Sequence, residues 1–219
     1  MIVIIKRLFK KIRSIVSRIR TDFKSLFLKI KKHSFDKKYW SQIYPTDNDA
    51  LKAELLEHSS IAERCKLGIV EIGILFGDTT RVLAQSNSSV PVYGIDPLIP
   101  DSMNPALVGS EEAIERNTEG LHNFHFFRDY SYNVIKTWNK PFDYLFIDGS
   151  HIYEHVKKDF EDWHPHLVGG GIVAFHDSTM NRGGQQYWEG PSRLADELIF
   201  DSRLNYIKSI GRLTIFQKK

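Results

Sequence analysis

Short apolar runs alternate with amphipathic stretches from about residue 50 to the end of the chain. Several of these runs are rich in β-branched residues and are followed by glycine, proline or an acidic residue, which is typical of buried parallel strands. Strands are expected at 69–72, 90–95, 124–127, 142–147, 172–175, 205–210 and 213–217, helices at 51–65, 111–117, 131–138, 151–163 and 192–200, and loops at 98–109 and 180–190. This alternation predicts a doubly wound, Rossmann-like α/β sheet of seven strands, mostly parallel. The connection from residue 210 to 213 permits only a hairpin, so the last strand is expected to be antiparallel.

The glycine turn after the first expected strand is a candidate binding site. Gly73 and Gly77 bracket this turn, and Asp78 or Thr79 can cap the helix that follows. A strand, a glycine turn and a helix N-terminus together offer backbone N–H groups and the positive end of a helix dipole to a cofactor. The alternative is an ordinary strand–helix turn in which the glycines serve packing alone.

Glu71, directly before this turn, narrows the choice of cofactor. A carboxylate at this place repels a pyrophosphate but suits the cationic amino-acid portion of a cofactor. The glycine spacing is G-x-x-x-G, whereas the dinucleotide fingerprint is G-x-G-x-x-G. Both observations argue against NAD.

Acidic residues end, or closely follow, five of the expected strands. They are Glu71, Asp96, Asp129, Asp148 and Asp177. Any one of them can be a helix cap or a turn residue. If the strands are parallel, however, all five lie along the edge where open α/β sheets bind their ligands.

The motifs around these residues resemble those of the class I S-adenosylmethionine-dependent methyltransferases. The motifs are VEIGILFGDTT (70–80), YGIDP (93–97), DYLFIDGSH (143–151) and GGGIVAFHD (169–177). Within that superfamily they look closest to small sugar O-methyltransferases of the macrocin type, with catechol-type enzymes as more distant relatives. The resemblance covers residues 50–217 and excludes the N-terminal segment.

The resemblance implies a role for each residue at the sheet edge. The methionine end of S-adenosylmethionine would be held by Glu71, Gly73, Gly77 and Thr79. Asp96 would accept both ribose hydroxyls, and Asp129 would lie near the adenine. Asp148 and Asp177 look like ligands of Mg²⁺. Ser178 departs from the catechol-type pattern, in which an amide or carboxylate is usual, and leaves His176 or Asn181 as a third ligand.

His151 follows Asp148 at the D-x-x-H spacing of some sugar O-methyltransferases. We interpret His151 as the general base that removes the proton of a sugar hydroxyl, with Asp148 as its catalytic partner through the metal. The alternative is that His151 caps a helix or binds substrate without moving a proton. His155 is expected to face solvent or to contact a residue that itself binds the metal or the substrate.

The segment 151–155 also satisfies H-x-x-E-H, a zinc peptidase pattern. That pattern needs both histidines well inside a long helix, together with a third ligand elsewhere. Here the motif starts at a strand–helix junction directly after Asp148 and Gly149. The peptidase interpretation is therefore not favoured.

The first 38 residues differ in composition from the rest of the chain. They hold 13 Lys and Arg against two Asp, a balance of +11, whereas the remaining residues hold 17 basic and 25 acidic side chains, a balance of −8. Apolar residues recur at steps of three and four from Ile5 to Ile30, which predicts a basic amphipathic helix. We expect residues 1–32 to lie on an anionic membrane surface; the alternative is that the apolar stripe packs on the body or on a second subunit of a homo-oligomer. The longest apolar run, 2–5, is too short to span a bilayer.

The whole pattern predicts a basic helical arm (1–38), a linker (39–49) and a methyltransferase domain (50–219). The expected activity is metal-assisted O-methylation of a sugar or a lipid-linked glycan precursor. The alternatives are an inactive membrane-associated interaction module or a methyltransferase for a catechol-like molecule. An acidic body argues against nucleic acid as a partner. The single cysteine, Cys65, excludes an intramolecular disulfide and fits a cytoplasmic protein, with peripheral attachment to the inner face of the membrane.

Overall fold

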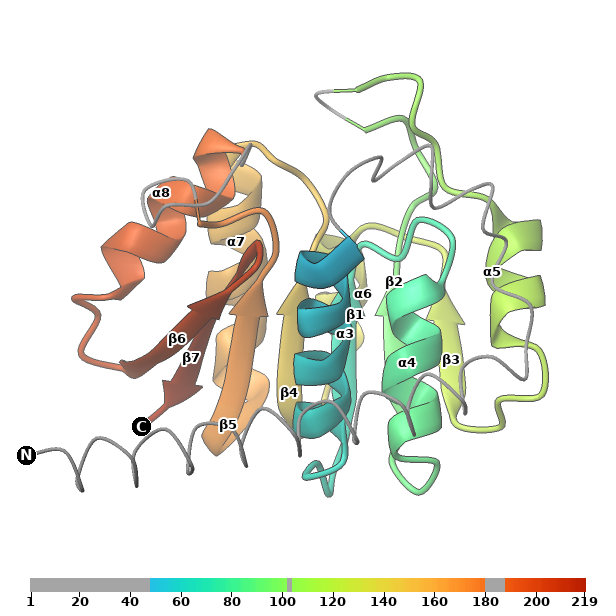
Figure 1. The fold of residues 1–219 in the computed structure, drawn as a ribbon, viewed down its shortest axis with the longest axis horizontal. Helices are drawn as coiled ribbons and strands as arrows, with labels where there is room; N and C mark the ends of the chain where they lie inside the picture. Colours follow the sequence, from blue (N-terminus) through green and yellow to red (C-terminus); the bar gives the residue numbers. More distant parts are fainter. Residues whose placement is uncertain (1–47, 102–103, 180–187) are drawn as a thin grey trace, which may run out of the picture. The chain divides into compact units, whose positions relative to one another are not determined.

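The computed structural model describes residues 48–101, 104–179 and 188–219 of the chain (Figure 1). Residues 49–219 form one compact unit. The predicted basic arm and nearly all of the predicted linker lie outside the described residues, as do Asn181 and most of the expected 180–190 loop. None of the described helices is long and apolar enough to cross a membrane.

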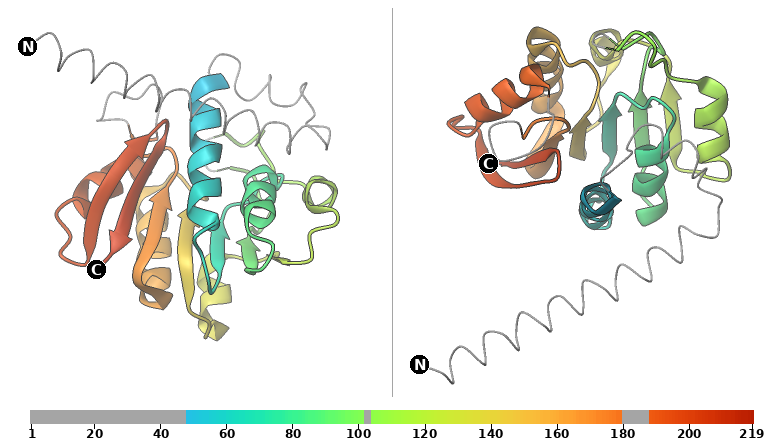
Figure 2. Two further views of the ribbon diagram at one scale, coloured as in Figure 1. Left: turned by 60° about the horizontal axis from the view of Figure 1, so that its bottom comes forward. Right: turned by 45° about the horizontal axis from the view of Figure 1, so that its top comes forward.

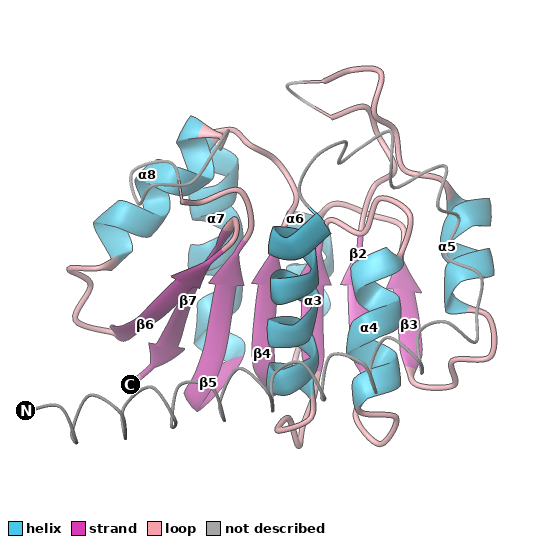
Figure 3. Ribbon diagram, viewed as in Figure 1, coloured by secondary structure: helices cyan, strands magenta, loops and turns pink. Residues whose placement is uncertain are grey.

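Strands and helices alternate through most of this unit (Figure 3). The strands are β1 (Ile69–Ile72), β2 (Val92–Ile95), β3 (Phe124–Phe127), β4 (Phe142–Ile147), β5 (Leu167–Phe175), β6 (Leu204–Ile210) and β7 (Leu213–Lys218). The α-helices are α3 (Asn48–Ala62), α4 (Asp78–Ser86), α5 (Glu111–Thr118), α6 (Ser131–Val134), α7 (Tyr153–Trp163) and α8 (Glu189–Leu198), with 3₁₀ turns η1 (Ile135–Thr137) and η2 (His164–His166).

The seven strands form one sheet in the order β3-β2-β1-β4-β5-β7-β6. Strands β1 to β5 are parallel, whereas β7 pairs antiparallel with both β5 and β6. The predicted Rossmann-like fold and its antiparallel last strand are therefore confirmed. The chain order reverses at β1, which has β2 on one side and β4 on the other, so the carboxyl ends of these three strands meet at a topological switch point.

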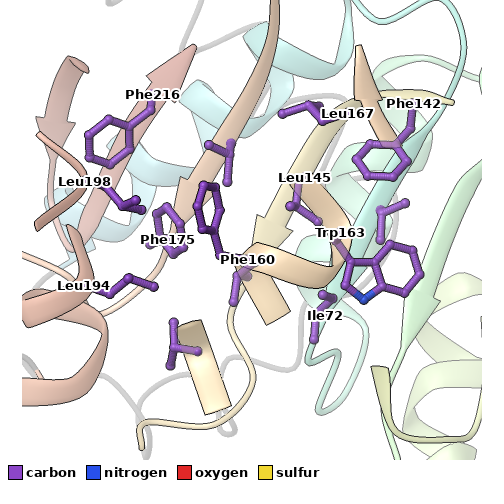
Figure 4. Close-up of a cluster of buried hydrophobic side chains, with 14 of the residues drawn as sticks. Ile72, Phe142, Leu145, Phe160, Trp163, Leu167, Phe175, Leu194, Leu198 and Phe216 are labelled. Carbon is purple, nitrogen blue, oxygen red and sulfur yellow. The ribbon is translucent and has the colours of Figure 1, made fainter. Parts of the chain in front are cut away.

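Both faces of the sheet are covered by helices, and each face carries its own apolar core. On one face, α6, α7 and α8 pack on the sheet through residues that include Val134. Phe160, Trp163 and Leu194 belong to the same cluster (Figure 4). On the other face, α3 and α4 pack through Ile61, Ala62, Leu83 and Ala84. In the right-hand view of Figure 2, α3 and α4 lie on one side of the sheet and α6 and α7 lie on the other. Because β1 and β4 lie at the centre and are buried on both sides, the residues at their carboxyl ends have a rigid foundation.

Several predicted element boundaries are wrong by a few residues. The helix expected at 131–138 stops at Val134 and continues as a 3₁₀ turn, and the helix expected at 151–163 begins at Tyr153. Strand β5 starts at Leu167 rather than at residue 172, because Leu167 pairs with Phe142 before a shift in register. The late start of α7 leaves His151 outside the helix.

Candidate active site

The turn after β1 is held by close backbone contacts. Gly73 has a φ of 88°, and a Cβ atom at this position would lie 2.1 Å from the carbonyl oxygen of Asp148. Gly77 has a φ of 84° and is the N-cap of α4, with no hydrogen bond from a capping side chain. The prediction that Asp78 or Thr79 caps α4 is therefore wrong. The end of β1 lies directly against the end of β4.

Glu71 points into the protein beneath this turn. Its side chain is buried, and its Oε2 accepts a hydrogen bond of 2.5 Å from the hydroxyl of Thr80 in α4. Burial, together with the nearby charges of Asp148, Asp96 and Asp78, raises the pKa of Glu71 well above its usual value, against the lowering effect of Thr80. The free protein therefore holds the proton of this carboxyl group more tightly than an ordinary glutamate side chain does. Contact between Glu71 and the amino end of a cofactor stays a prediction.

Asp96, at the end of β2, organises the glycine turn. Its Oδ2 accepts hydrogen bonds from the backbone N–H groups of Ile74 (2.8 Å) and Leu75 (2.9 Å), and its Oδ1 accepts one from Leu98 (2.7 Å). Sequence reasoning missed this role, because the spacing between Asp96 and the turn gives no sign of the contact. Both carboxylate oxygens are partly occupied, and the predicted bonds to ribose hydroxyls would add to this set.

The two other predicted cofactor residues lie at the same sheet edge. Thr79 is half-buried in the first turn of α4. Asp129 is exposed after β3, and its Oδ1 accepts hydrogen bonds from the backbone N–H of Tyr130 (2.7 Å) and the amide of Asn133 (3.0 Å). The side-chain hydrogen bond from Asn133 and the backbone one from Tyr130 lower the pKa of Asp129. A charged carboxylate thus remains accessible beside β3.

Asp148, His151 and Asp177 come together at the ends of β4 and β5. Each offers one ligand atom, and these three atoms lie within 4.8 Å of one another. His151 Nε2 lies 3.2 Å from Asp177 Oδ2. Asp177 has a φ of 48°, a left-handed conformation that aspartate tolerates better than most residues. Two carboxylates and an imidazole in this arrangement can bind a divalent cation.

His151 is surrounded by carboxylates on both edges of its ring. Nδ1 lies 3.2 Å from Asp101 Oδ2, opposite the contact between Nε2 and Asp177. Burial would lower the pKa of His151, but the hydrogen bond to Asp177 and the charges of Asp177, Asp148 and Asp101 raise it above its usual value. The ring of Trp188 packs on the imidazole, with the two ring centroids 4.7 Å apart.

His176 forms a second buried link behind this cluster. Its Nδ1 lies 3.0 Å from Asp148 Oδ1 and 3.4 Å from Asp177 Oδ2, and its Nε2 lies 3.4 Å from Glu54 Oε2 in α3. Burial would lower the pKa of His176, but the charges of Asp148 and Asp177 hold it well above its usual value. The ring therefore connects the two predicted metal ligands to the helix layer below the sheet.

Arg212, in the β6–β7 turn, joins the same group of charged residues through Asp177 and Glu54. Its Nη1 donates to Asp177 Oδ1 (3.1 Å), and its backbone N–H donates to Glu54 Oε1 (2.7 Å). Burial would raise the pKa of Asp177, but its charged partners, His176 first, hold it far below its usual value. Asp177 thus presents one oxygen to Arg212 and the other to the two histidines.

The remaining candidates take other roles or lie elsewhere. The Ser178 hydroxyl donates to the Phe175 carbonyl (2.7 Å), and Asn181 lies outside the described residues. His155 is exposed, as predicted, and its Nδ1 lies 3.0 Å from the Ser150 hydroxyl oxygen. Because His151 precedes α7, the two histidines of the H-x-x-E-H segment are not on consecutive turns of one helix, which removes the basis for a peptidase.

The fold is that of class I methyltransferases. The O-methyltransferase NovP superposes with a TM-score of 0.61 at 20% identity over 76% of this chain and 79% of NovP. TomG of Streptomyces achromogenes, an O-methyltransferase solved in complex with S-adenosylmethionine, gives a TM-score of 0.55 at 14% identity over 85% of this chain and 100% of TomG. CalS11, a TDP-rhamnose 3'-O-methyltransferase, gives a TM-score of 0.53 at 16% identity over 90% of this chain and 93% of CalS11.

The family follows from the sequence itself. Residues 70–178, about half of the chain, match the family model described as a methyltransferase domain. The chain therefore belongs to the class I S-adenosylmethionine-dependent methyltransferases, as its motifs predicted. A relative, uncharacterized protein R132 of Acanthamoeba polyphaga mimivirus, is 28% identical over 145 residues, which span 62% of this chain and 62% of that protein. The match thus covers less than two thirds of this relative.

Three residues of the site were not found from the sequence. Asp101 lies in a segment recognised only as a loop, and Glu54 and Arg212 lie outside the matched region, 158 residues apart. The only signals were charged residues in a helix and in a tight turn, which are common on protein surfaces. Their contacts with His151, His176 and Asp177 could be seen only in the folded chain.

Proposed function

We propose that the protein transfers a methyl group from S-adenosylmethionine to a sugar hydroxyl, with the help of a divalent cation. The cluster of Asp148, His151 and Asp177 carries this proposal, because it lies beside the glycine turn that ends β1. A methyl donor held at that turn and an acceptor held at the cluster would be neighbours across the contact between Gly73 and Asp148.

The donor side rests on residues of the turn and of the adjacent strand ends. Gly73, Gly77 and Thr79 would surround the methionine portion, with Glu71 beneath it. Asp96 would bind the ribose hydroxyls, and Asp129, exposed and charged, would lie at the adenine. The N-terminus of α4 adds the positive end of a helix dipole, which suits the carboxylate of the methionine portion.

The acceptor side rests on the chemistry of the donor atoms in the cluster. Carboxylates suit Mg²⁺ and Mn²⁺, and an imidazole is also accepted by Mn²⁺ more readily than by Mg²⁺. His151 would therefore serve in one of two ways: as a third ligand of the cation beside Asp148 and Asp177, or as the base described next. A divalent cation bound there would stabilise the negative charge that develops on the acceptor oxygen.

The chain's own residues would remove the hydroxyl proton. As the methyl group leaves the sulfonium and bonds to the acceptor oxygen, that oxygen must lose its proton to a base. His151 is our candidate, because its imidazole lies beside the carboxylates that would hold the cation and the acceptor. Whether His151 acts as the base or as a ligand of the cation is decided by its effect on metal affinity, since a base that is not a ligand leaves that affinity unchanged.

A sugar acceptor is supported by one of the structural neighbours. CalS11 acts on TDP-rhamnose according to its description, and this chain follows its fold over 90% of its length. Trp188, which packs on His151, offers an aromatic surface of the kind on which sugar rings bind. A catechol-like acceptor would use the same cluster.

Calorimetry with S-adenosylhomocysteine, in buffers containing Mn²⁺, Mg²⁺ or EDTA, tests the proposal. We expect the nucleoside to bind in all three buffers, and Mn²⁺ to bind to wild-type protein but not to the double variant Asp148→Asn, Asp177→Asn. Binding of the nucleoside without any binding of metal would remove the cation from the proposal. No binding of either would favour a non-catalytic interaction module.

The basic arm supports a membrane-proximal acceptor. We propose that residues 1–32 lie on the anionic inner face of the cytoplasmic membrane, where lipid-linked glycan precursors are found. Each Lys or Arg near such a surface contributes about 1 kcal/mol, screened by salt. Full-length protein should sediment with anionic vesicles at low salt, and protein lacking residues 1–32 should not. Failure of both to sediment would instead favour packing of the arm on protein, including a second copy in a homo-oligomer.

A further inference from the structure

We infer that Asp101 is a positioning residue that fixes the orientation and tautomer of His151. In this role Asp101 keeps a proton on Nδ1 and thereby presents Nε2 to the carboxylates of Asp148 and Asp177. The inference deepens the proposed function, since it names the residue that would prepare His151 for either metal binding or proton transfer.

The loop between β2 and α5 is built to present this carboxylate. Pro100 and Val108 form an isolated antiparallel bridge, and the backbone N–H of Asp101 donates to the Leu107 carbonyl (2.8 Å). Asp101 Oδ1 accepts a hydrogen bond of 2.6 Å from the backbone N–H of Asn104. With Oδ1 occupied in this way, Oδ2 is the oxygen that faces the imidazole.

The same loop is attached to the glycine turn. The backbone N–H of Ser110 donates to the Leu75 carbonyl (3.1 Å), and Asp96 accepts from the N–H groups of both Leu75 and Leu98. The position of Asp101 is thus connected by hydrogen bonds to the predicted donor side of the site.

The Nδ1 atom of His151 faces the carboxylate of Asp101. Nδ1 is buried and has no hydrogen bond in this conformation, although Asp101 Oδ2 lies only 3.2 Å away. The side chains of both residues are 13% exposed, so water has little access to compete for the contact.

A carboxylate at one nitrogen decides what the other nitrogen can do. A neutral imidazole carries its proton on one nitrogen only, and a hydrogen-bond acceptor beside Nδ1 favours the form in which Nε2 has a free lone pair. Metal-binding histidines commonly donate their second N–H to such a partner, and loss of the partner lowers metal affinity or activity by about 10- to 100-fold. Without Asp101, the carboxylate of Asp177 beside Nε2 would be the acceptor left at the ring among the described residues, and it favours a proton on Nε2 instead.

The test is a long-range ¹H–¹⁵N NMR spectrum of the full chain. It is recorded over a series of pH values that extends to those at which His151 is neutral. The His151 signals are assigned by their loss in His151→Asn. In wild type we expect the proton on Nδ1, and in Asp101→Ala a mixture of tautomers or a shift to Nε2. The variant Asp101→Asn keeps an acceptor oxygen without the charge, so its fraction of Nδ1–H tautomer should lie between those of wild type and Asp101→Ala. This variant also provides the comparison if Asp101→Ala does not fold. Identical tautomers in wild type and both variants would overturn the inference.

A Mn²⁺ titration followed by electron paramagnetic resonance provides the second readout. Asp101→Ala should bind Mn²⁺ about 10- to 100-fold more weakly than wild type. The matched control is Glu112→Gln, which removes an exposed negative charge in the first turn of α5 and should leave the affinity unchanged. If wild type binds no Mn²⁺, the metal in the proposed function fails, and the NMR tautomer still decides the role of Asp101. An equal loss in both variants would mean a general effect of charge and would count against Asp101.

Discussion

The two halves of the sheet edge use acidic residues in different ways. At the ends of β1 and β2, the partners of Glu71 and Asp96 are a hydroxyl and backbone N–H groups, all of which are neutral. After β4 and β5, the partners of Asp148 and Asp177 are imidazoles and a guanidinium. The first pair builds a turn, whereas the second pair creates a concentration of charge. An acidic residue after a strand therefore has no single meaning, and its partners determine its role.

The difference extends to protonation. Burial without a cationic partner raises the pKa of Glu71, whereas His176, His151 and Arg212 lower the pKa of Asp177 although it is also buried. Burial is thus common to both halves, and the nearby charge decides whether the pKa of the carboxyl group is raised or lowered.

The largest effect should come from the charged half. Asp177→Asn keeps the size of the side chain and tolerates the left-handed backbone, but it removes the charge that a cation needs. We expect methyl transfer to fall by about 10²- to 10⁴-fold, as expected for the loss of several kcal/mol of transition-state stabilisation. Affinity for S-adenosylhomocysteine should change little. Transfer of radiolabelled methyl groups to an acceptor measures the first quantity, and chelator should reproduce the defect; full activity in EDTA would contradict the metal assignment.

A smaller effect is expected in the neutral half. Asp96→Ala leaves three backbone N–H groups without their acceptor, and each loss of a partner at a partly buried group weakens the turn. The free energy of unfolding should fall by about 1–3 kcal/mol, and affinity for S-adenosylhomocysteine should fall with it. Denaturant unfolding and calorimetry measure the two effects. Lost affinity with unchanged stability would assign Asp96 to the ribose alone, and unchanged affinity would remove Asp96 from the cofactor site.

The smallest effect concerns the pH dependence of stability. The folded pKa of Glu71 is raised above the value of 4.5 typical of the unfolded chain, so the folded state holds this proton more tightly. Stability contributed by Glu71 is therefore present below pH 4.5 and is lost as the pH rises toward the folded pKa. Glu71→Gln cannot ionise and keeps an acceptor for Thr80. The free energy of unfolding of Glu71→Gln relative to wild type should rise between pH 5 and 8; a constant difference would show that Glu71 is ionised in both states.

Most of the sheet could be predicted from sequence because its strands are short apolar runs followed by turn residues. The acidic residues after those runs identified the correct edge, and their motifs identified the family. The starts of α7 and α8 were less accurate, because Ile152 and Glu189 fit a helix, a turn or a loop equally well by pattern. Local sequence carries little information on such boundaries.

The partners of the site residues could not be predicted from the sequence. Glu54 and Arg212 meet only because α3 and the β6–β7 turn lie side by side at the end of β5. Asp101 reaches His151 from a loop whose bridge, between Pro100 and Val108, depends on no strong turn motif. Tertiary contacts of this kind join residues with no regular spacing. Sequence reasoning therefore identified the candidate ligands but missed what holds them.

The close approach of Gly73 to the carbonyl of Asp148 bears on how the methyl donor and the acceptor are spaced and aligned. Methyl transfer requires donor sulfur, methyl carbon and acceptor oxygen to be collinear, with a tolerance of a fraction of an ångström. If the proposed function holds, the two reactants bind on opposite sides of the place where the backbones of Gly73 and Asp148 meet. There is no room at that place for even one extra carbon atom. The separation of the reactants would then be a property of the scaffold, while side chains around it remain free to change which acceptor is chosen.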